Sequence, residues 1–224
     1  MIQALKNYSK KKNANKIISL INSHPEILDF KDYYGSSGLM IIAYHQLDQA
    51  LEKAVSLKKS LTYHEAIVCG KIEAVEDYLQ LYDSRGINTL SQDGYPPLCL
   101  AAFFHQTEIA KLLIKHGADV NLIAKNISRV TALQAAVSKE NYELCVLLLK
   151  AGANPNIAQT QNATALHTAV YKGNLALVKL LVDYGAFTSS RMYSGESPLC
   201  IARQKGNQEI IDYLYDAKKK EYYS

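Results

Sequence analysis

The strongest constraint on the fold is a short motif that returns at a nearly constant interval. Its four copies read YPPLCLAA at residues 95–102, VTALQAAV at 130–137, ATALHTAV at 163–170 and ESPLCIAR at 196–203. Each copy is anchored by a leucine, and the successive spacings are 35, 33 and 33 residues, between Leu98, Leu133, Leu166 and Leu199. A period of this length predicts one supersecondary unit that is stacked several times.

The copy that starts at Thr164 indicates how one unit folds. Thr164 can cap a first helix, and apolar residues then recur at the i, i+3 and i+4 positions. Gly173 ends this helix because glycine adopts the left-handed conformation after a helix with little strain. A second helix is expected from Leu175 to the residue before Gly185, with Leu180 on its buried stripe. Helices this short are unstable alone in water, so each is expected to pack on its neighbours.

These residues resemble the ankyrin repeat, which joins a Thr-Pro-Leu-His-type first helix to a Gly-Ala-Asp-Val-Asn-type exit loop. The matching exit loops of this chain read GADVN at 117–121, GANPN at 152–156 and GAFT at 185–188. The resemblance covers about residues 61–215. It implies an all-α fold, namely an ankyrin-type helical repeat solenoid of stacked helix-turn-helix units with protruding loops. It also implies that His64 and His167, as the motif histidines, make local hydrogen bonds between units.

The two ends of the stack are expected to depart from the repeat, because a stack needs polar outer caps. Residues 1–58 are predicted to form divergent helix pairs that cap the stack, and residues 59–224 to form the repeats. The expected repeat boundaries are 59–91, 92–125, 126–159, 160–191 and 192–222.

The sequence gives no positive sign of an enzyme. Its four cysteines form no Cys-x-x-Cys pair, and no histidine is placed with a Ser or Cys and an Asp as in a catalytic triad. The GSSG turn at residues 35–38 lacks the Lys-Ser/Thr ending of a phosphate-binding loop. We therefore predict a non-catalytic protein that needs no cofactor, metal or small-molecule substrate.

The composition bears on location and partners. No apolar run approaches the roughly 18 residues of a membrane span, and the N-terminus lacks the apolar region of a signal peptide. We therefore expect a cytoplasmic monomer with no membrane contact, although an effector delivered into a host cell would look the same. The net charge is +4, but the basic runs lie near the two ends and no basic row is expected to follow the repeat. Nucleic acid is therefore a weaker candidate partner than protein.

The remaining candidate site is the surface. The two residues before each helix-ending glycine position are expected to face a concave groove, and the loop tips lie beside it. Aromatic residues in these places favour a protein interface. The expected partner-binding residues are Tyr44, Tyr95, Phe103, Phe104, Arg129, Lys139, Tyr171, Lys172 and Tyr193.

The function predicted from the sequence is a protein-protein interaction scaffold that binds its partner through the groove and the loop tips. Phe103 and Phe104 are adjacent and cannot both face the core, so the alternative is that one packs under the next loop and the other is a lone exposed residue. The alternative functions are a bacterial effector, an accessory subunit of an enzyme complex and, less favoured, a nucleic-acid-binding protein.

Overall fold

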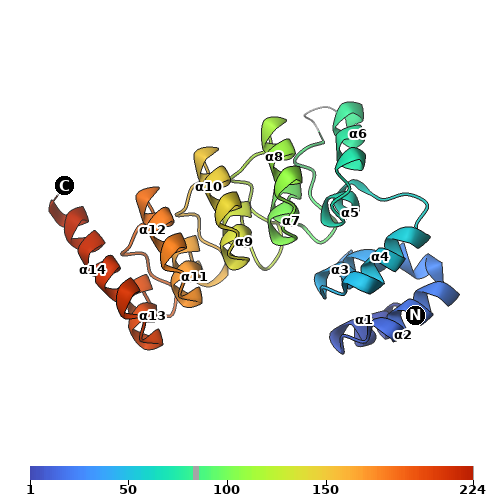
Figure 1. Cartoon of the computed structure of the whole chain (residues 1–224), viewed down its shortest axis with the longest axis horizontal. Coiled ribbons are helices and arrows are strands. Elements are labelled where there is room, and N and C mark those ends of the chain that lie inside the picture. Colours follow the sequence, from blue (N-terminus) through green and yellow to red (C-terminus); the bar gives the residue numbers. More distant parts are fainter. Residues whose placement is uncertain (83–85, 224) are drawn as a thin grey trace. The chain divides into compact units, whose positions relative to one another are not determined.

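The computed structural model describes residues 1–82 and 86–223, with side chains up to Lys219, and this part of the chain is built from helices (Figure 1). It contains 14 α-helices and the short 3₁₀ helices Pro25–Leu28 and Thr160–Asn162. An isolated β-bridge joins Lys31 and Ser37, and the described residues form no β-strand. The prediction of an all-α fold is confirmed. None of the described helices combines the length and the apolar character that crossing a bilayer requires.

The chain divides into two compact units, residues 1–97 and 98–224. The first unit holds three helix pairs. They are α1 (Ile2–Lys10) with α2 (Ala14–Ser23), α3 (Gly38–Tyr44) with α4 (Asp48–Leu57), and α5 (Tyr63–Val68) with α6 (Ile72–Tyr82). Apolar residues of α1–α4 and the 3₁₀ helix form a closed core that includes Leu5, Ile17, Ile21, Leu28 and Ile42, all fully buried.

The second unit holds four helix pairs that lie side by side in chain order (Figure 1). They are α7 (Pro97–Phe103) with α8 (Thr107–Lys115), α9 (Ala132–Ser138) with α10 (Tyr142–Lys150), α11 (Ala165–Lys172) with α12 (Leu175–Asp183), and α13 (Pro198–Lys205) with α14 (Gln208–Tyr223). First helices pack on first helices, as α11 does on both α9 and α13. The anchoring residues Leu133 and Leu166 are buried, and so is Leu180 on the second helix.

Three of the first helices, α5, α9 and α11, begin at threonines that act as N-caps. In α9 the Thr131 N–H donates to Gln134 Oε1 at 2.8 Å, and in α11 the Thr164 N–H donates to His167 Nδ1 at 3.1 Å. The same reciprocal capping box is present at the start of α5, where Thr62 is the N-cap. Polar groups that a helix start would leave unpaired are thereby satisfied.

His64 makes a hydrogen bond as expected, but it does not occupy the capping position of the motif histidine. In α5 the residue that completes the capping box with Thr62 is Glu65, whose Oε2 accepts the Thr62 N–H at 3.0 Å. Thr62 precedes Gly70 by eight residues, whereas Thr164 precedes Gly173 by nine, so α5 starts one residue later in the repeat register. His64 therefore falls outside the capping position, and its Nε2 lies 2.7 Å from the carbonyl oxygen of Thr89.

The expected boundary at residue 58 lies inside the first compact unit. Lys58 follows α4 and forms an ion pair with Glu65 of α5, with 2.7 Å between Nζ and Oε2. Ser37, the N-cap of α3, donates a hydrogen bond to the same carboxylate at 2.6 Å. These contacts join the α3–α4 pair to α5, so residues before and after position 58 share one unit. Each of the five expected repeats contains one helix pair.

Candidate partner-binding surface

The ends of the first helices in the second unit carry a repeated pair of positions. The first position is Phe103, Ser138, Tyr171 and Gln204 in successive repeats, and the second is Phe104, Lys139, Lys172 and Lys205. We call the exposed and half-buried aromatic and lysine residues among them the first-helix surface, which consists of Phe103, Phe104, Lys139, Tyr171, Lys172 and Lys205. All six residues lie at the end of a first helix, directly after the buried stripe of that helix.

The end of α7 meets the end of α9 through a cation–π contact. Lys139 Nζ lies 4.0 Å from the centroid of the Phe103 ring. The Phe103 and Phe104 rings meet edge to face with centroids 5.2 Å apart, and both residues are half-buried. The sequence predicts either that both phenylalanines belong to a binding surface or that one is packed and the other exposed. Neither is fully buried or fully exposed, so the structure lies between these two alternatives. Burial, together with the charge of Lys172, lowers the pKa of Lys139.

The end of α11 repeats this arrangement with α13. Lys205 Nζ lies 3.9 Å from the centroid of the Tyr171 ring, and Tyr171 is 61% exposed. Lys172 Nζ lies 3.7 Å from Glu140 Oε1 of the preceding repeat, and both side chains are exposed. Asn174 Nδ2 donates a hydrogen bond to Glu140 Oε2 at 3.1 Å.

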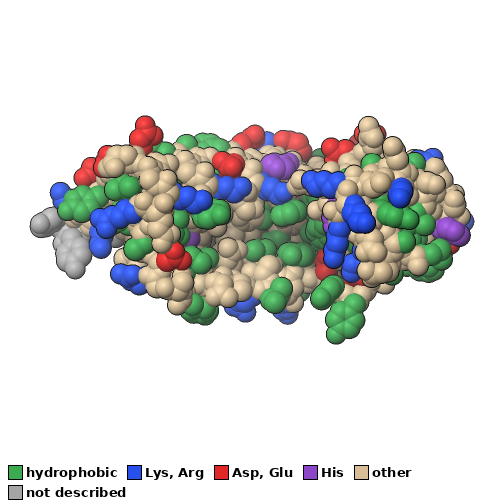
Figure 2. Space-filling model, turned by 90° about the horizontal axis from the view of Figure 1, so that it is seen from below, with side chains coloured by type: hydrophobic (Ala, Val, Ile, Leu, Met, Phe, Trp, Pro, Cys, Tyr) green, Lys and Arg blue, Asp and Glu red, His purple; other side chains and the backbone are tan. Residues whose placement is uncertain are grey.

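The expectation that no row of basic residues follows the repeat is wrong. Lys139, Lys172 and Lys205 are spaced by 33 residues each and occupy the same position in three consecutive repeats. Lys205 is absent from the residues expected to bind a partner, although it lies directly before Gly206 and so occupies a position expected to face the groove. Figure 2 shows Lys and Arg side chains beside hydrophobic side chains over the second unit, at the left and centre of that view.

Two predicted residues lie at the loop tips of the second unit. Arg129 is exposed and adopts a left-handed conformation with φ 52°. Tyr193 is 80% exposed, and its backbone N–H donates to the carbonyl oxygen of Gln161 in the preceding tip at 3.0 Å. The tip residue Ile127 is 90% exposed and is a further apolar group beside Arg129. Tyr193, Ile127 and Arg129 thus give the tips an aromatic, an aliphatic and a cationic side chain at the surface.

The other two predicted residues, Tyr44 and Tyr95, belong to the first unit. Their ring centroids are 6.2 Å apart. The Tyr44 hydroxyl group donates to Asp93 Oδ2 at 2.7 Å, and burial together with the Asp93 charge raises the pKa of Tyr44. Tyr44 is thus part of an internal polar network, and its hydroxyl group is already engaged.

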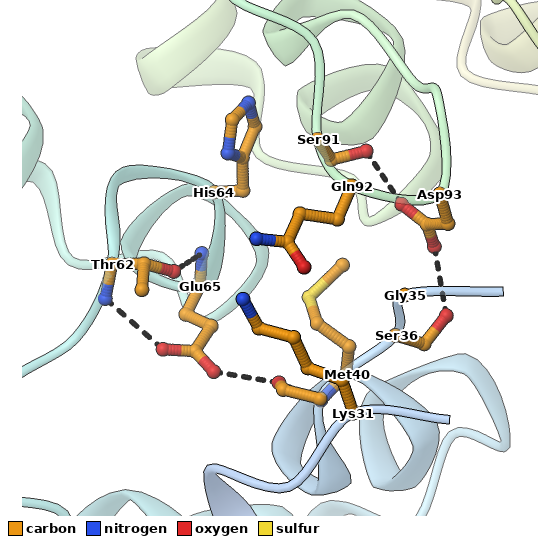
Figure 3. A pocket seen from close by; sticks show the side chains of 11 residues that line it. Lys31, Gly35, Ser36, Met40, Thr62, His64, Glu65, Ser91, Gln92 and Asp93 are labelled. Carbon is orange, nitrogen blue, oxygen red and sulfur yellow. Dashed lines mark hydrogen bonds between the residues drawn. The ribbon is translucent and has the colours of Figure 1, made fainter. Parts of the chain in front are cut away.

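That network borders a polar pocket of about 120 Å³ in the first unit (Figure 3). Asp93 accepts hydrogen bonds from Ser36 Oγ at 3.1 Å and from Ser91 Oγ at 2.5 Å. On the opposite wall, burial lowers the pKa of His64. The carboxylate of Asp93 is therefore committed to holding the loops around the pocket.

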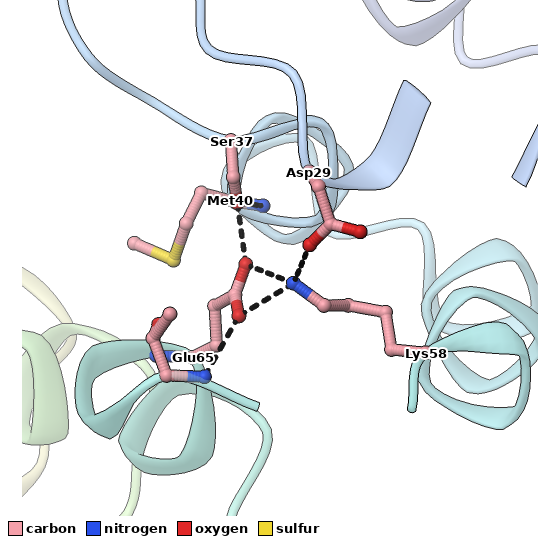
Figure 4. Close-up of polar contacts among 6 residues, drawn as sticks. Asp29, Ser37, Met40, Lys58 and Glu65 are labelled. Atoms are coloured by element: carbon pink, nitrogen blue, oxygen red, sulfur yellow. Dashed lines mark hydrogen bonds and ion pairs between the residues drawn. The ribbon is translucent and has the colours of Figure 1, made fainter. Parts of the chain in front are cut away.

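A buried ion pair lies behind one wall of this pocket (Figure 4). Lys58 Nζ contacts both oxygens of Glu65, at 2.8 and 2.7 Å, and Asp29 Oδ1 at 2.8 Å. Only 4% of the Lys58 side chain and 3% of the Glu65 side chain are exposed. Burial alone would lower the pKa of Lys58, but its hydrogen bonds with Asp29 and Glu65 raise it. These groups neutralise one another, so that removal of one partner would leave a buried charge uncompensated.

The described side chains include no group of three or more His, Cys, Asp or Glu residues placed to hold a metal ion.

The sequence profile of the family described as Ankyrin repeats (3 copies) matches residues 63–159 and 154–223, which is more than half of the chain. The chain belongs to the ankyrin repeat family.

Curated relatives share parts of this ankyrin repeat chain. The Ankyrin repeat, SAM and basic leucine zipper domain-containing protein 1 of Dasypus novemcinctus is 32% identical over 118 residues, which are 50% of this chain and 24% of the relative. The Ankyrin repeat and KH domain-containing protein 1 of Homo sapiens is 34% identical over 88 residues, 39% of this chain and 3% of the relative. Phosphocholine transferase AnkX of Legionella pneumophila is 44% identical over 54 residues, 24% of this chain and 6% of the relative. The chain thus spans about a quarter or less of each relative's length.

Proposed function

We propose that this chain is a non-catalytic interaction scaffold that binds a partner protein through the first-helix surface, with Arg129 and Tyr193 at its margin. Its membership of the ankyrin repeat family supports this proposal, because stacked repeats create extended binding surfaces. The observation that carries it is the exposure of aromatic and lysine side chains in one register across consecutive repeats. We also propose that the scaffold acts as a cytoplasmic monomer.

Aromatic side chains are the groups expected to supply most of the binding energy. Tyr171 is mostly exposed, and Phe103 and Phe104 are half-buried. Truncation of a central aromatic residue in an interface often costs about 2 kcal/mol or more. Because the lysines hold their charges over two of these rings, a partner can contact an apolar and a charged group at each repeat.

The test replaces two aromatic residues at once. Partners are first captured with the wild-type chain and identified by mass spectrometry, and the affinity of the purified pair is then measured. Phe104→Ala with Tyr171→Ala should weaken binding at least about tenfold, or roughly 1.4 kcal/mol, while the unfolding midpoint stays nearly unchanged.

The matched control replaces two exposed tyrosines outside this surface, Tyr142→Ala and Tyr184→Ala, which are 49% and 40% exposed. It should leave binding unchanged. A folded Phe104/Tyr171 double variant that binds as tightly as wild type would exclude the first-helix surface. Tyr44 and Tyr95 of the first unit, or the second helices, would then be the better candidates.

A second candidate function is that of an accessory subunit of an enzyme complex, or of an effector that a bacterium delivers into a host cell. The similarity to a Legionella pneumophila phosphocholine transferase favours this candidate. It requires that the captured partner be an enzyme in a stoichiometric complex with the chain. Capture of partners without such a complex would leave the plain scaffold as the function.

A further inference from the structure

The chemistry of the partner can be inferred from the distribution of charge in the second unit. Residues 98–224 hold 14 Lys and Arg against 10 Asp and Glu, whereas residues 1–97 hold 11 of each. The whole net charge of +4 therefore belongs to the second unit.

Within that unit the positive charge is concentrated on one set of segments. The first helices and the loops that lead into them hold seven basic and two acidic residues, in segments 98–106, 122–141, 157–174 and 188–207. The second helices and the loops that follow them hold seven basic and eight acidic residues. The first-helix side thus carries a net charge of +5 and the remainder a net charge of −1, so the excess positive charge lies where the aromatic residues lie.

Within residues 1–82 and 86–219, no buried carboxylate forms an ion pair with the three lysines of the first-helix surface. Lys139 and Lys205 lie over aromatic rings, which orient each ammonium group without cancelling its charge. Lys172 has Glu140 at 3.7 Å, but both side chains are exposed, and such pairs contribute little. Burial and, as the smaller cause, the positive charge of Lys172 lower the pKa of Lys139, so the two ammonium groups repel each other. An anion lying across neighbouring repeats would relieve this repulsion.

The spacing of the repeats sets the spacing that negatively charged groups of a partner need in order to reach the three lysines. Packed helices are about 8–10 Å apart, and a peptide in the extended polyproline II conformation advances about 9 Å in three residues while completing one turn, so every third side chain faces the same way. One repeat therefore matches about three residues of an extended peptide. We propose that the first-helix surface binds an extended acidic segment of the partner protein, with carboxylates at about every third residue facing Lys139, Lys172 and Lys205. This inference rests on the proposed function and names the chemistry of the partner.

A peptide fits this surface better than a single-stranded nucleic acid does. Bases bind such proteins by stacking on open aromatic faces. Here Lys139 and Lys205 cover one face each of Phe103 and Tyr171, at 4.0 and 3.9 Å. Glu140 also lies between the lysines and would repel a continuous row of phosphates.

The test selects random linear 16-residue peptides, displayed on phage, with the full chain as bait. Enriched peptides should carry Asp or Glu at about every third residue. Their affinity should fall at least about tenfold for the variant Lys139→Gln, Lys172→Gln, Lys205→Gln. It should also fall when NaCl is raised from about 0.1 M to about 1 M, because the screening length drops from about 10 Å to about 3 Å.

The matched control removes the same charge from the second helices, by Lys115→Gln, Lys150→Gln and Lys179→Gln, and should leave the affinity within about twofold. Glu140→Gln should tighten peptide binding, because it removes the carboxylate that competes for Lys172. Unfolding melts confirm that each variant is folded, and the single Lys172→Gln, at an exposed site, replaces the triple variant if that variant unfolds.

Three results would overturn the inference. They are a selection without enrichment of acidic residues, peptides that bind the lysine variant as tightly as wild type, and a fluorescein-labelled 20-nucleotide DNA strand that binds more tightly than any selected peptide. If the selected peptides lose affinity with Phe104→Ala and Tyr171→Ala but not with the lysine variant, the proposed scaffold function stands and only the acidic chemistry fails.

Discussion

Residues of three different kinds perform one task at the third position of the first helices. Glu65 in α5, Gln134 in α9 and His167 in α11 each accept the backbone N–H of the capping threonine. The geometry requires only an acceptor at that place. The three acceptors differ in how their hydrogen bonds respond to pH, because histidine titrates near neutral pH and glutamine does not.

We predict that His167→Gln makes the protein less sensitive to mild acid. Burial lowers the pKa of His167 below its ordinary value of 6.5, so the folded state holds the neutral ring. Stability is therefore fully present above that value and falls as the pH drops below about 6.5, where the unfolded chain binds the proton more readily. Denaturant melts at pH 7.5 and 5.5 should show a smaller loss for the variant and a similar stability at pH 7.5. His64, whose pKa is also lowered, retains part of the effect. An unchanged loss would exclude His167 as its source.

A second residue-scale prediction concerns the ends of the first helices. Gly70, Gly173 and Gly206 have φ values of 69°, 73° and 68°, and His105 occupies the equivalent position at φ 58°. A left-handed residue with a Cβ is strained by about 1–2 kcal/mol, and glycine lowers stability by about 0.4–1 kcal/mol through the unfolded chain. His105→Gly should thus stabilise the protein by about 0.5–1 kcal/mol in denaturant melts.

The control for this prediction is Gly206→Ala. A Cβ at Gly206 would meet no atom within 4 Å, so only backbone strain opposes it, and stability should fall by a similar amount. If His105→Gly lowers stability instead, the histidine side chain contributes contacts that outweigh its strain.

At the scale of whole elements, asparagine side chains join successive exit loops. Asn121 Nδ2 donates to the carbonyl oxygen of Gly152 at 3.0 Å, and its Oδ1 accepts the Asn154 N–H at 2.7 Å. One repeat later, Asn156 bonds to Gly185 and Phe187 in the same way, at 2.8 Å each. Each asparagine pairs one acceptor and one donor of the following loop and so fixes the distance between neighbouring repeats.

We predict that Asn121→Ala lowers the free energy of unfolding by about 1–2 kcal/mol, because it removes two hydrogen bonds of about 0.5–1.5 kcal/mol each. Asn121→Asp should cost less, since its carboxylate can still accept the Asn154 N–H. Equal losses for the two variants would show that the amide donor to Gly152 carries the whole effect.

At the scale of the whole molecule, stability depends on contacts between neighbouring repeats. α14 packs on α12, and α13 packs on α11. Ile210 and Leu214 of α14 are buried, as are Leu177 and Leu181 of α12. The repeat formed by α13 and α14 therefore covers apolar side chains of α12.

We predict that deletion of residues 192–224 lowers solubility and stability, because Leu177 and Leu181 become exposed to water. Light scattering and thermal melts should report aggregation and a lower midpoint. Deletion of residues 218–224 alone keeps Ile210 and Leu214 and should remain soluble. A chain ending at residue 191 that stays monomeric and equally stable would show that α12 does not need this cover.

The periodic sequence by itself determined the helix pairs, their stacking and the buried stripe that includes Leu180, because burial of a face follows from residue spacing alone. The tertiary structure decided which polar groups meet. The Thr62-x-x-Glu65 capping box of α5 is local, but the hydrogen bond from Ser37 to the Glu65 carboxylate spans 28 residues. Likewise, Lys139 reaches Phe103 and Lys205 reaches Tyr171 across a repeat boundary, and Tyr44 reaches Asp93 across 49 residues. Such contacts depend on the distance between segments remote in sequence, and periodicity carries no measure of that distance.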